Sequence, residues 1–116
     1  ITEMNHLEYH PLRGNIFESM IVSEMVKNRM NKGLKLNLYY WRDKSGHEVD
    51  LIIDNVTHLK PVEIKSSSTI NSSYFENLDY WMTLSGTDKG YLIYTGLENQ
   101  SRTKYEVLSW NSLNDL

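Results

Sequence analysis

Asp50, Glu63 and Lys65 are the residues of this sequence whose types and spacing are best suited to chemistry. Twelve residues separate the two carboxylates, and the lysine follows the second carboxylate after one intervening residue. Carboxylate oxygens are hard ligands that Mg²⁺ and Mn²⁺ accept, with water completing the coordination. A lysine beside them can hold an attacking water or face a phosphate. This combination indicates metal-assisted hydrolysis of a phosphodiester, because a cation activates water and neutralises charge on the phosphate.

Two predicted strands must bring these residues together. Residues 47–54 and 61–65 are rich in aliphatic side chains, which is typical of strands, and a proline is tolerated at the start of the second one. The spacing between Asp50 and Glu63 suits an antiparallel hairpin. Since alternate side chains of a strand share a face, we expect Asp50 to meet Glu63 and Lys65 on one side of the sheet.

Strict alternation also predicts which neighbours of Asp50 point the other way. Val49, Leu51 and Ile53 are expected to share the opposite face of the strand. These apolar neighbours place the charged side chains close to a core, where an unpaired charge is costly and a ligand or a polar network is favoured. The backbone carbonyl of Ile64 is a further candidate metal ligand.

A simpler interpretation of the same residues stays open. Asp50 would be an exposed strand carboxylate, and Glu63 and Lys65 a cross-strand charge pair worth about 0.2–1 kcal/mol.

The remaining elements follow from apolar periodicity and turn residues. Apolar side chains predict a helix over residues 16–30, which Gly33 ends. One buried stripe is expected to consist of Phe17, Ile21 and Met25 at four-residue spacing, with Ile16 and Met20 beside them. A second helix is expected to begin with a capping box of Ser73 and Glu76 and to end near residue 84. Further strands are expected over residues 36–42, 90–94 and 105–108, with turns over 43–46, 55–60 and 97–102.

The resulting order, α-β-β-β-α-β followed by one more strand, predicts an α/β (α+β) domain with a mixed central sheet flanked by helices. Residues 1–12 show no clean period and are predicted to be an N-terminal arm, with the domain spanning residues 13–116. The chain opens on Ile1 rather than on a methionine, so we expect a fragment of a longer protein.

Composition limits the classes of function. The chain has no cysteine, which excludes disulfides, thiolate metal sites and a cysteine nucleophile, and suits a cytoplasmic protein. No apolar run approaches the length of a membrane span. The net charge is −3, with nine basic and nine acidic residues in positions 1–65 and three basic and six acidic residues after them. Any anionic ligand, including DNA, is therefore expected near the first half of the chain.

Three stretches in order resemble a known family. The run Pro61-Val62-Glu63-Ile64-Lys65, preceded by Asp50, resembles the PD-(D/E)xK motif of the restriction-endonuclease-like superfamily, whose common core has the same order of elements. More narrowly, the chain is similar to the C-terminal domain of unknown function that follows an AAA-type P-loop ATPase domain in bacterial and archaeal proteins. The stretches that carry this resemblance are Gly14-Asn15-Ile16-Phe17-Glu18, Tyr40-Trp41-Arg42 with Glu48-Val49-Asp50, and Val62-Glu63-Ile64-Lys65-Ser66-Ser67.

The resemblance implies roles for four residues. In active nucleases of the superfamily, the residues that match Asp50 and Glu63 bind Mg²⁺, and the residue that matches Lys65 assists the water. A glutamate on the first helix often completes the site, and Glu18 matches it by position. From the residues alone, Glu18 lies at the edge of the buried helix stripe, beside Phe17, where a solvated position is the alternative.

Three functions stay open at this point. The first is a metal-dependent nuclease-like domain that hydrolyses DNA and follows an ATPase domain. The second is a binding or assembly module in which the four polar residues form a structural network without catalysis. The third is a structural C-terminal cap. No Gly-rich loop with Lys-Ser or Lys-Thr occurs, so the chain has no P-loop of its own.

Residues near the predicted hairpin are secondary candidates. His47 is either a phosphate contact or an exposed turn residue. The aromatic run 39–41 either stacks on bases or packs on the core. Arg42 and Lys44 either touch a DNA backbone or lie in a solvated turn.

Overall fold

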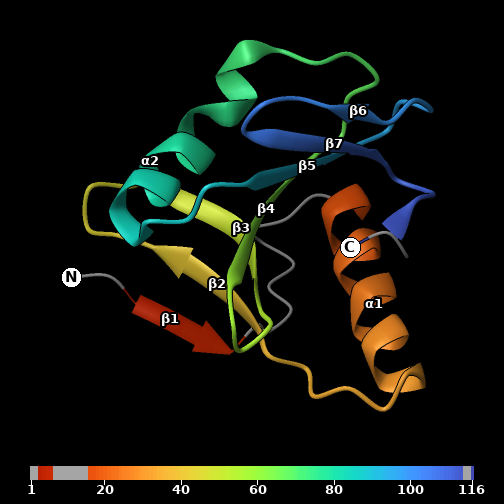
Figure 1. The fold of residues 1–116 in the computed structure, drawn as a ribbon. Helices are drawn as coiled ribbons and strands as arrows, with labels where there is room; N and C mark the ends of the chain where they lie inside the picture. The colour runs from red at the N-terminus through yellow and green to blue at the C-terminus, as the bar shows by residue number, and fades with distance from the viewer. Residues whose placement is uncertain (1–2, 7–15, 114–115) are drawn as a thin grey trace.

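One mixed sheet of seven strands lies between two helices in the computed structural model, which describes residues 3–6, 16–113 and 116 (Figure 1). Its elements follow one another as β1 (Glu3–His6), α1 (Ile16–Asn31), β2 (Leu38–Arg42), β3 (Glu48–Asp54), β4 (Leu59–Lys65), the 3₁₀ turn η1 (Ser72–Phe75), α2 (Glu76–Ser85), β5 (Gly90–Tyr94), β6 (Gln100–Ser101) and β7 (Tyr105–Ser109).

The spatial order of the strands is β1-β2-β3-β4-β5-β7-β6. Strands β1 to β4 pair antiparallel, and β4, β5 and β7 are parallel neighbours, with β6 antiparallel to β7. Because β4 and β5 are parallel, the chain must cross over between them, and α2 makes this crossover. The predicted α/β class, the order of elements and the mixed sheet flanked by helices are confirmed.

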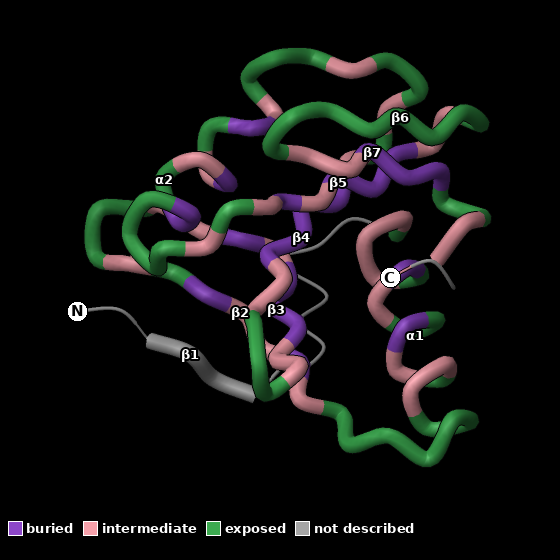
Figure 2. The backbone as a smooth tube through the Cα atoms, in the orientation of Figure 1, coloured by how far each residue is buried: buried purple, intermediate pink, exposed green. Residues whose placement is uncertain are grey.

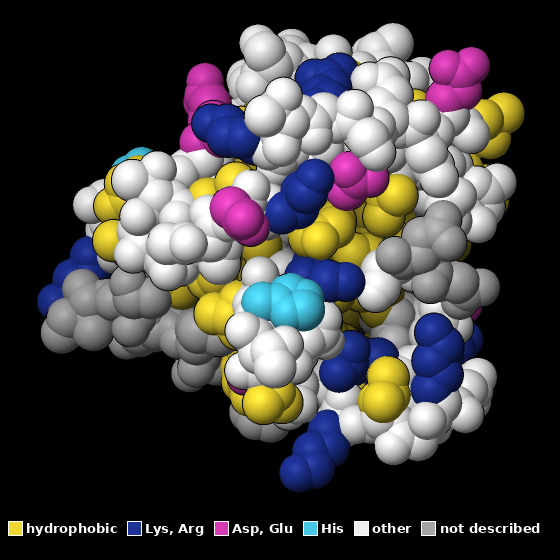
Figure 3. All heavy atoms as spheres, viewed as in Figure 1, with side chains coloured by type: hydrophobic (Ala, Val, Ile, Leu, Met, Phe, Trp, Pro, Cys, Tyr) yellow, Lys and Arg dark blue, Asp and Glu magenta, His cyan; other side chains and the backbone are white. Residues whose placement is uncertain are grey.

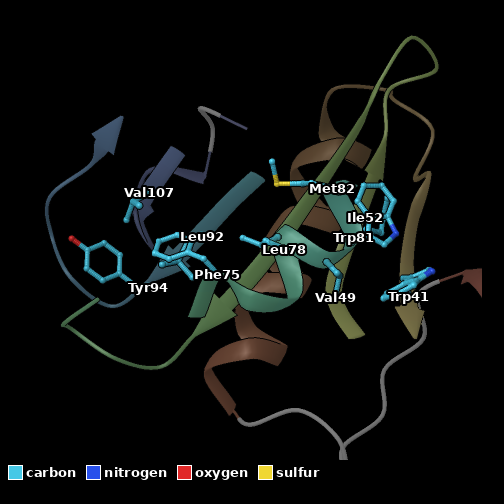
Figure 4. Packing of buried hydrophobic residues seen from close by; sticks show 10 residues of the cluster. All are labelled: Trp41, Val49, Ile52, Phe75, Leu78, Trp81, Met82, Leu92, Tyr94 and Val107. Carbon is cyan, nitrogen blue, oxygen red and sulfur yellow. The ribbon is translucent and has the colours of Figure 1, made fainter. Parts of the chain in front are cut away.

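The two faces of the sheet bury separate apolar clusters. Helix α2 covers one face and α1 the other, and the buried segments run along the central strands (Figures 1 and 2). The α2-side cluster, drawn in Figure 4, consists of Trp41, Val49, Ile52, Phe75, Leu78, Trp81, Met82, Leu92, Tyr94 and Val107. The α1-side cluster consists of Ile21, Met25, Leu38, Leu51, Ile53, Val62, Ile64, Ile93 and Leu108.

Helix α1 confirms the predicted stripe only in part. Ile21 and Met25 are buried as expected, but Ile16 is 89% exposed and Met20 is 42% exposed. The stripe widens instead toward Val22 and Val26, which pack against the α1-side cluster. Four-residue spacing therefore identified the buried centre of the stripe, Ile21 and Met25. It did not show which neighbouring residues of the helix also contact the sheet.

Residues 3–6 of the predicted N-terminal arm form a strand. They form β1, which pairs along β2 from Glu3↔Arg42 to His6↔Tyr39. Residues 1–2 and 7–12 of the predicted arm lie outside the described residues. An edge strand is held by backbone hydrogen bonds to its neighbour, so it needs no apolar alternation of its own.

Two local predictions are wrong in the C-terminal half. Residues 97–102 were expected to be a turn, yet Gln100 and Ser101 pair with β7 as the short strand β6. The expected capping box does not form either. Asn71 caps the 3₁₀ turn by accepting a hydrogen bond from the Ser73 backbone N–H at 2.9 Å, and α2 begins only at Glu76 without a side-chain cap.

Neither helix of the described part of the chain is long and apolar enough to cross a membrane.

The tip of the β3–β4 hairpin carries a strained residue and gives a first testable prediction. Val56 has φ of 72° and is 87% exposed. A left-handed conformation costs a residue with a side chain roughly 1–2 kcal/mol. Glycine avoids this steric cost, but it loses more backbone entropy on folding, which offsets part of the gain. We expect Val56→Gly to raise the free energy of unfolding by about 0.5–1 kcal/mol in urea denaturation.

Thr57→Gly is the matched control, since Thr57 is the next exposed residue and has no positive φ. This control should lower stability. A destabilising effect of both substitutions would show that Val56 is not strained.

Candidate active site

The predicted hairpin opens into a fork at Asp50 and Glu63. Strands β3 and β4 pair from Asp54↔Leu59 to Leu51↔Val62, where their mutual register ends. Beyond this point β3 pairs only with β2, and β4 only with β5. The inner edges of both strands therefore leave backbone donors that the sheet itself does not satisfy.

The two carboxylates satisfy those donors reciprocally. The backbone N–H of Asp50 donates to Oε1 of Glu63 at 3.1 Å, and the backbone N–H of Ile64 donates to Oδ2 of Asp50 at 2.9 Å. A buried backbone N–H without a partner costs about 1–3 kcal/mol, so both side chains stabilise the fork. The same two bonds fix where the carboxylates lie.

A β-bulge next to the fork corrects the predicted alternation of β3. Between Tyr39↔Ile52 and Trp41↔Val49, β2 advances by two residues and β3 by three. Val49 consequently shares the α2-side cluster with Ile52, whereas Leu51 belongs to the α1-side cluster. Bulges are enriched beside active sites because they redirect one side chain without moving the sheet.

Glu63 and Lys65 lie on the α2 side of β4. Their neighbours in register are Leu92 and Tyr94, both members of the α2-side cluster. Glu63 is 3% exposed, and its Oε2 lies 3.7 Å from Nζ of Lys65. The Lys65 ammonium also lies 5.5 Å from the ring centroid of Tyr74, at the outer edge of the same face.

The pKa of Glu63 is raised well above its ordinary value of 4.5. Burial is the largest cause, because the charged form is poorly solvated in the core. The negative charge of Asp50 raises the pKa further, and Glu18 adds a smaller contribution of the same sign. Lys65 and the hydrogen bond from Asp50 act in the opposite direction without cancelling the rise.

The structure thus brings the predicted residues together. Asp50, Glu63 and Lys65 meet at the fork, through hydrogen bonds and an ion pair. Glu18, in the first turn of α1, is close enough for its charge to act on Glu63.

One polar pair beside the fork was missed from the sequence. The Tyr40 hydroxyl donates to Oε2 of Glu48 between β2 and β3. The contact is diagonal, because the register places Glu48 opposite Arg42, two residues after Tyr40. The pairing of β2 with β3 is needed to find it, and the sequence of either strand alone does not supply that information.

The carboxylate oxygens of Asp50 and Glu63 are ligands suited to a hard cation, and the fork brings these two side chains together. Among the residues that the structure describes, no group of three or more His, Cys, Asp and Glu side chains is arranged to hold a metal ion. Asp50 and Glu63 nevertheless form an adjacent pair of carboxylates, one of them buried, which a divalent cation would neutralise. Mg²⁺ is often bound by one or two carboxylates, with water and substrate phosphate completing the coordination.

Comparison with protein families gives a match over residues 13–113, to the domain of unknown function DUF4143. The chain belongs to this family. The match covers the fork, both helices and strands β2 to β7. No curated protein matches the chain in sequence.

The raised pKa of Glu63 gives a second prediction. Between pH 4.5 and its raised pKa, folded chains keep a proton on Glu63 that unfolded chains lose, so the contribution of Glu63 to stability falls as pH rises. Glu63→Gln removes this titration. The free energy of unfolding of the variant, relative to the wild type, should therefore increase from about pH 5 to pH 8 in urea denaturation with EDTA.

Glu76→Gln, which neutralises an exposed carboxylate at the start of α2, controls for the loss of charge alone. A difference between Glu63→Gln and wild type that does not change with pH would show that ionised Glu63 is accommodated at no cost.

Proposed function

We propose that this domain hydrolyses phosphodiester bonds of DNA with the help of Mg²⁺ or Mn²⁺ held at the fork. The observation that supports this function is the pair of half-buried Asp50 and buried Glu63, fixed by reciprocal backbone hydrogen bonds, with the Lys65 ammonium 3.7 Å from Glu63. Two fixed carboxylates beside a partly exposed lysine are the arrangement that metal-assisted phosphodiester hydrolysis requires.

Asp50 and Glu63 are the residues that would hold the cation. The bound cation would supply neutralisation of the negative charge that develops on the phosphate. Lys65 orients the attacking water, because its flexible ammonium donates up to three hydrogen bonds from the rim of the fork. Glu18 supports the site through its negative charge, which adds to the attraction for a cation.

The wider setting belongs to the same proposal. The element order and the Asp50, Glu63 and Lys65 motif support a restriction-endonuclease-like domain that follows an ATPase domain in a cytoplasmic protein. DNA is the expected partner. Lys and Arg side chains gather over the C-terminal end of α1 and the loop after it (Figure 3), where Lys32 and Lys35 are exposed. Such a surface favours an anionic polymer.

Cleavage of DNA tests this proposal as a third prediction. We expect plasmid or oligonucleotide DNA to be cleaved in Mn²⁺ or Mg²⁺ but not in EDTA. Glu63→Gln and Lys65→Met should each lower the rate about 100-fold or more, since each removes a group that acts on the reacting phosphate or water.

The ion pair between Lys89, just before β5, and Glu106 of β7 has a distance of 3.4 Å and offers the matched control. Glu106→Gln and Lys89→Met should leave cleavage unchanged. Cleavage that survives in Glu63→Gln would contradict the mechanism, and folded wild type without cleavage in either metal would contradict the activity.

The reciprocal hydrogen bonds favour a second candidate, a binding or assembly module without catalysis. In this function Asp50 and Glu63 serve only to close the fork, and Lys65 only to balance the charge of Glu63. Replacing Glu18, Asp50, Glu63 and Lys65 together by alanine separates the two candidates in a pull-down with DNA or with the ATPase domain. Unchanged capture with no metal-dependent cleavage in the wild type would support the module.

A further inference from the structure

His47 lies in a built environment next to the fork that the proposed reaction does not use. It ends the turn between β2 and β3 and directly precedes Glu48, the first residue of β3. Its side chain is 38% exposed.

Asp43 holds both the backbone and the ring of His47. Oδ1 of Asp43 accepts hydrogen bonds from the backbone N–H of Ser45 at 3.0 Å and of His47 at 2.9 Å. Oδ2 lies 3.3 Å from Nδ1 of the imidazole. A carboxylate against Nδ1 leaves Nε2 as the nitrogen that can meet a further partner.

Tyr80 of α2 fixes the plane of the imidazole. The two rings are stacked, with centroids 3.7 Å apart and an angle of 1° between their planes. Tyr80 in turn lies 6.2 Å from the buried ring of Trp41. Contacts with Asp43 and with Tyr80 restrict the rotation of the His47 ring. A histidine in a solvated turn would not require such contacts.

The imidazole also lies on the side of the sheet that carries the proposed chemistry. Its contact with α2 places it on the α2 side, where Glu63 and Lys65 lie. His47 directly precedes β3 and Lys65 ends β4, so both residues lie at the open end of the hairpin, where the two strands no longer pair. Two residues lie between His47 and Asp50, which corresponds to about 10 Å along an extended chain, and a nucleic-acid strand spans this distance in a few nucleotides.

We propose that His47 is a substrate-positioning residue whose Nε2 binds a phosphate of the polynucleotide strand that enters the fork, a few nucleotides from the phosphate at Glu63 and Lys65. This role rests on the proposed function and adds a specific contact to it. A phosphate oxygen accepts from an imidazole N–H, and the Asp43 carboxylate on the other nitrogen strengthens that bond. The two arms of the fork then hold the strand together, with His47 just before β3 and Lys65 at the end of β4.

The competing role for His47 is a latch that only fastens the β2–β3 turn to α2. His47→Phe separates the two roles, because phenylalanine keeps the stack on Tyr80 and loses both nitrogens. His47→Gln provides the conservative rescue, since its amide N–H lies near the place of Nε2. His58→Phe is the control, at the exposed tip of the other hairpin.

Binding of a short fluorescein-labelled single-stranded DNA, followed by fluorescence anisotropy, is the fourth prediction. All variants are made in the Glu63→Gln background, so that affinity is measured without cleavage. We expect His47→Phe to weaken binding about five- to tenfold at unchanged thermal stability, as the loss of one phosphate contact implies. His47→Gln should recover most of the affinity, and His58→Phe should bind like the parent.

Parent-like binding by His47→Phe would overturn the positioning role and leave His47 as a latch. Absence of binding by the Glu63→Gln parent would overturn it as well. Weakened binding by His47→Phe in a protein whose wild type does not cleave would uphold this inference while the proposed catalysis fails, so the two failures are distinguishable.

Discussion

The exchange of two hydrogen bonds between side chains and backbone at the β3–β4 fork is the constraint on which the rest of the site depends. Glu63 of β4 accepts from the backbone N–H of Asp50 on β3, and Asp50 accepts from the backbone N–H of Ile64 on β4. Without them, the strands would either keep pairing and close the fork or leave buried donors without partners. The fork is possible because the two carboxylates accept the backbone hydrogen bonds that strand pairing no longer provides beyond Leu51 and Val62.

This arrangement places two carboxylates side by side, and Lys65 compensates their negative charge only in part. Glu63 is buried beside Asp50, and Lys65 is the cation that the described structure sets against it, at 3.7 Å from a partly exposed position. Three events can neutralise the pair further, namely protonation of Glu63, closer approach of Lys65, or binding of a divalent cation. A cation at the pair would free Lys65 to act on water, which links the stability of the fork to its proposed chemistry.

Much of this site could be predicted from the sequence because Asp50, Glu63 and Lys65 lie on two strands that follow one another in the chain. The spacing of Asp50, Glu63 and Lys65 and the apolar residues around them predicted two adjacent strands with the charges beside a core. Glu18 required the family resemblance, since helical periodicity placed it only at the edge of a stripe. The aromatic run 39–41 was left open, and burial of Trp41 shows that this residue packs in the core.

The features that escaped prediction depend on pairing between distant segments. The bulge in β3 depends on the register against β2, and alternation counted along β3 alone cannot detect one extra residue. Strands β1 and β6 are held at the two edges by neighbours whose backbone is already ordered, so their own sequences carry little strand signal. The start of α2 was misplaced because Asn71 caps a 3₁₀ turn that precedes the helix.

Calorimetric titration of Mn²⁺ into the wild-type domain and into Asp50→Asn/Glu63→Gln tests the central claim most directly, because it asks whether the carboxylate pair binds a cation, independently of any substrate. The account predicts saturable binding to the wild type, with release of protons from Glu63 at a pH below its raised pKa, and loss of that binding in the double variant. Equal heats for the folded wild type and the folded double variant would contradict it, and would leave the fork as a structural device.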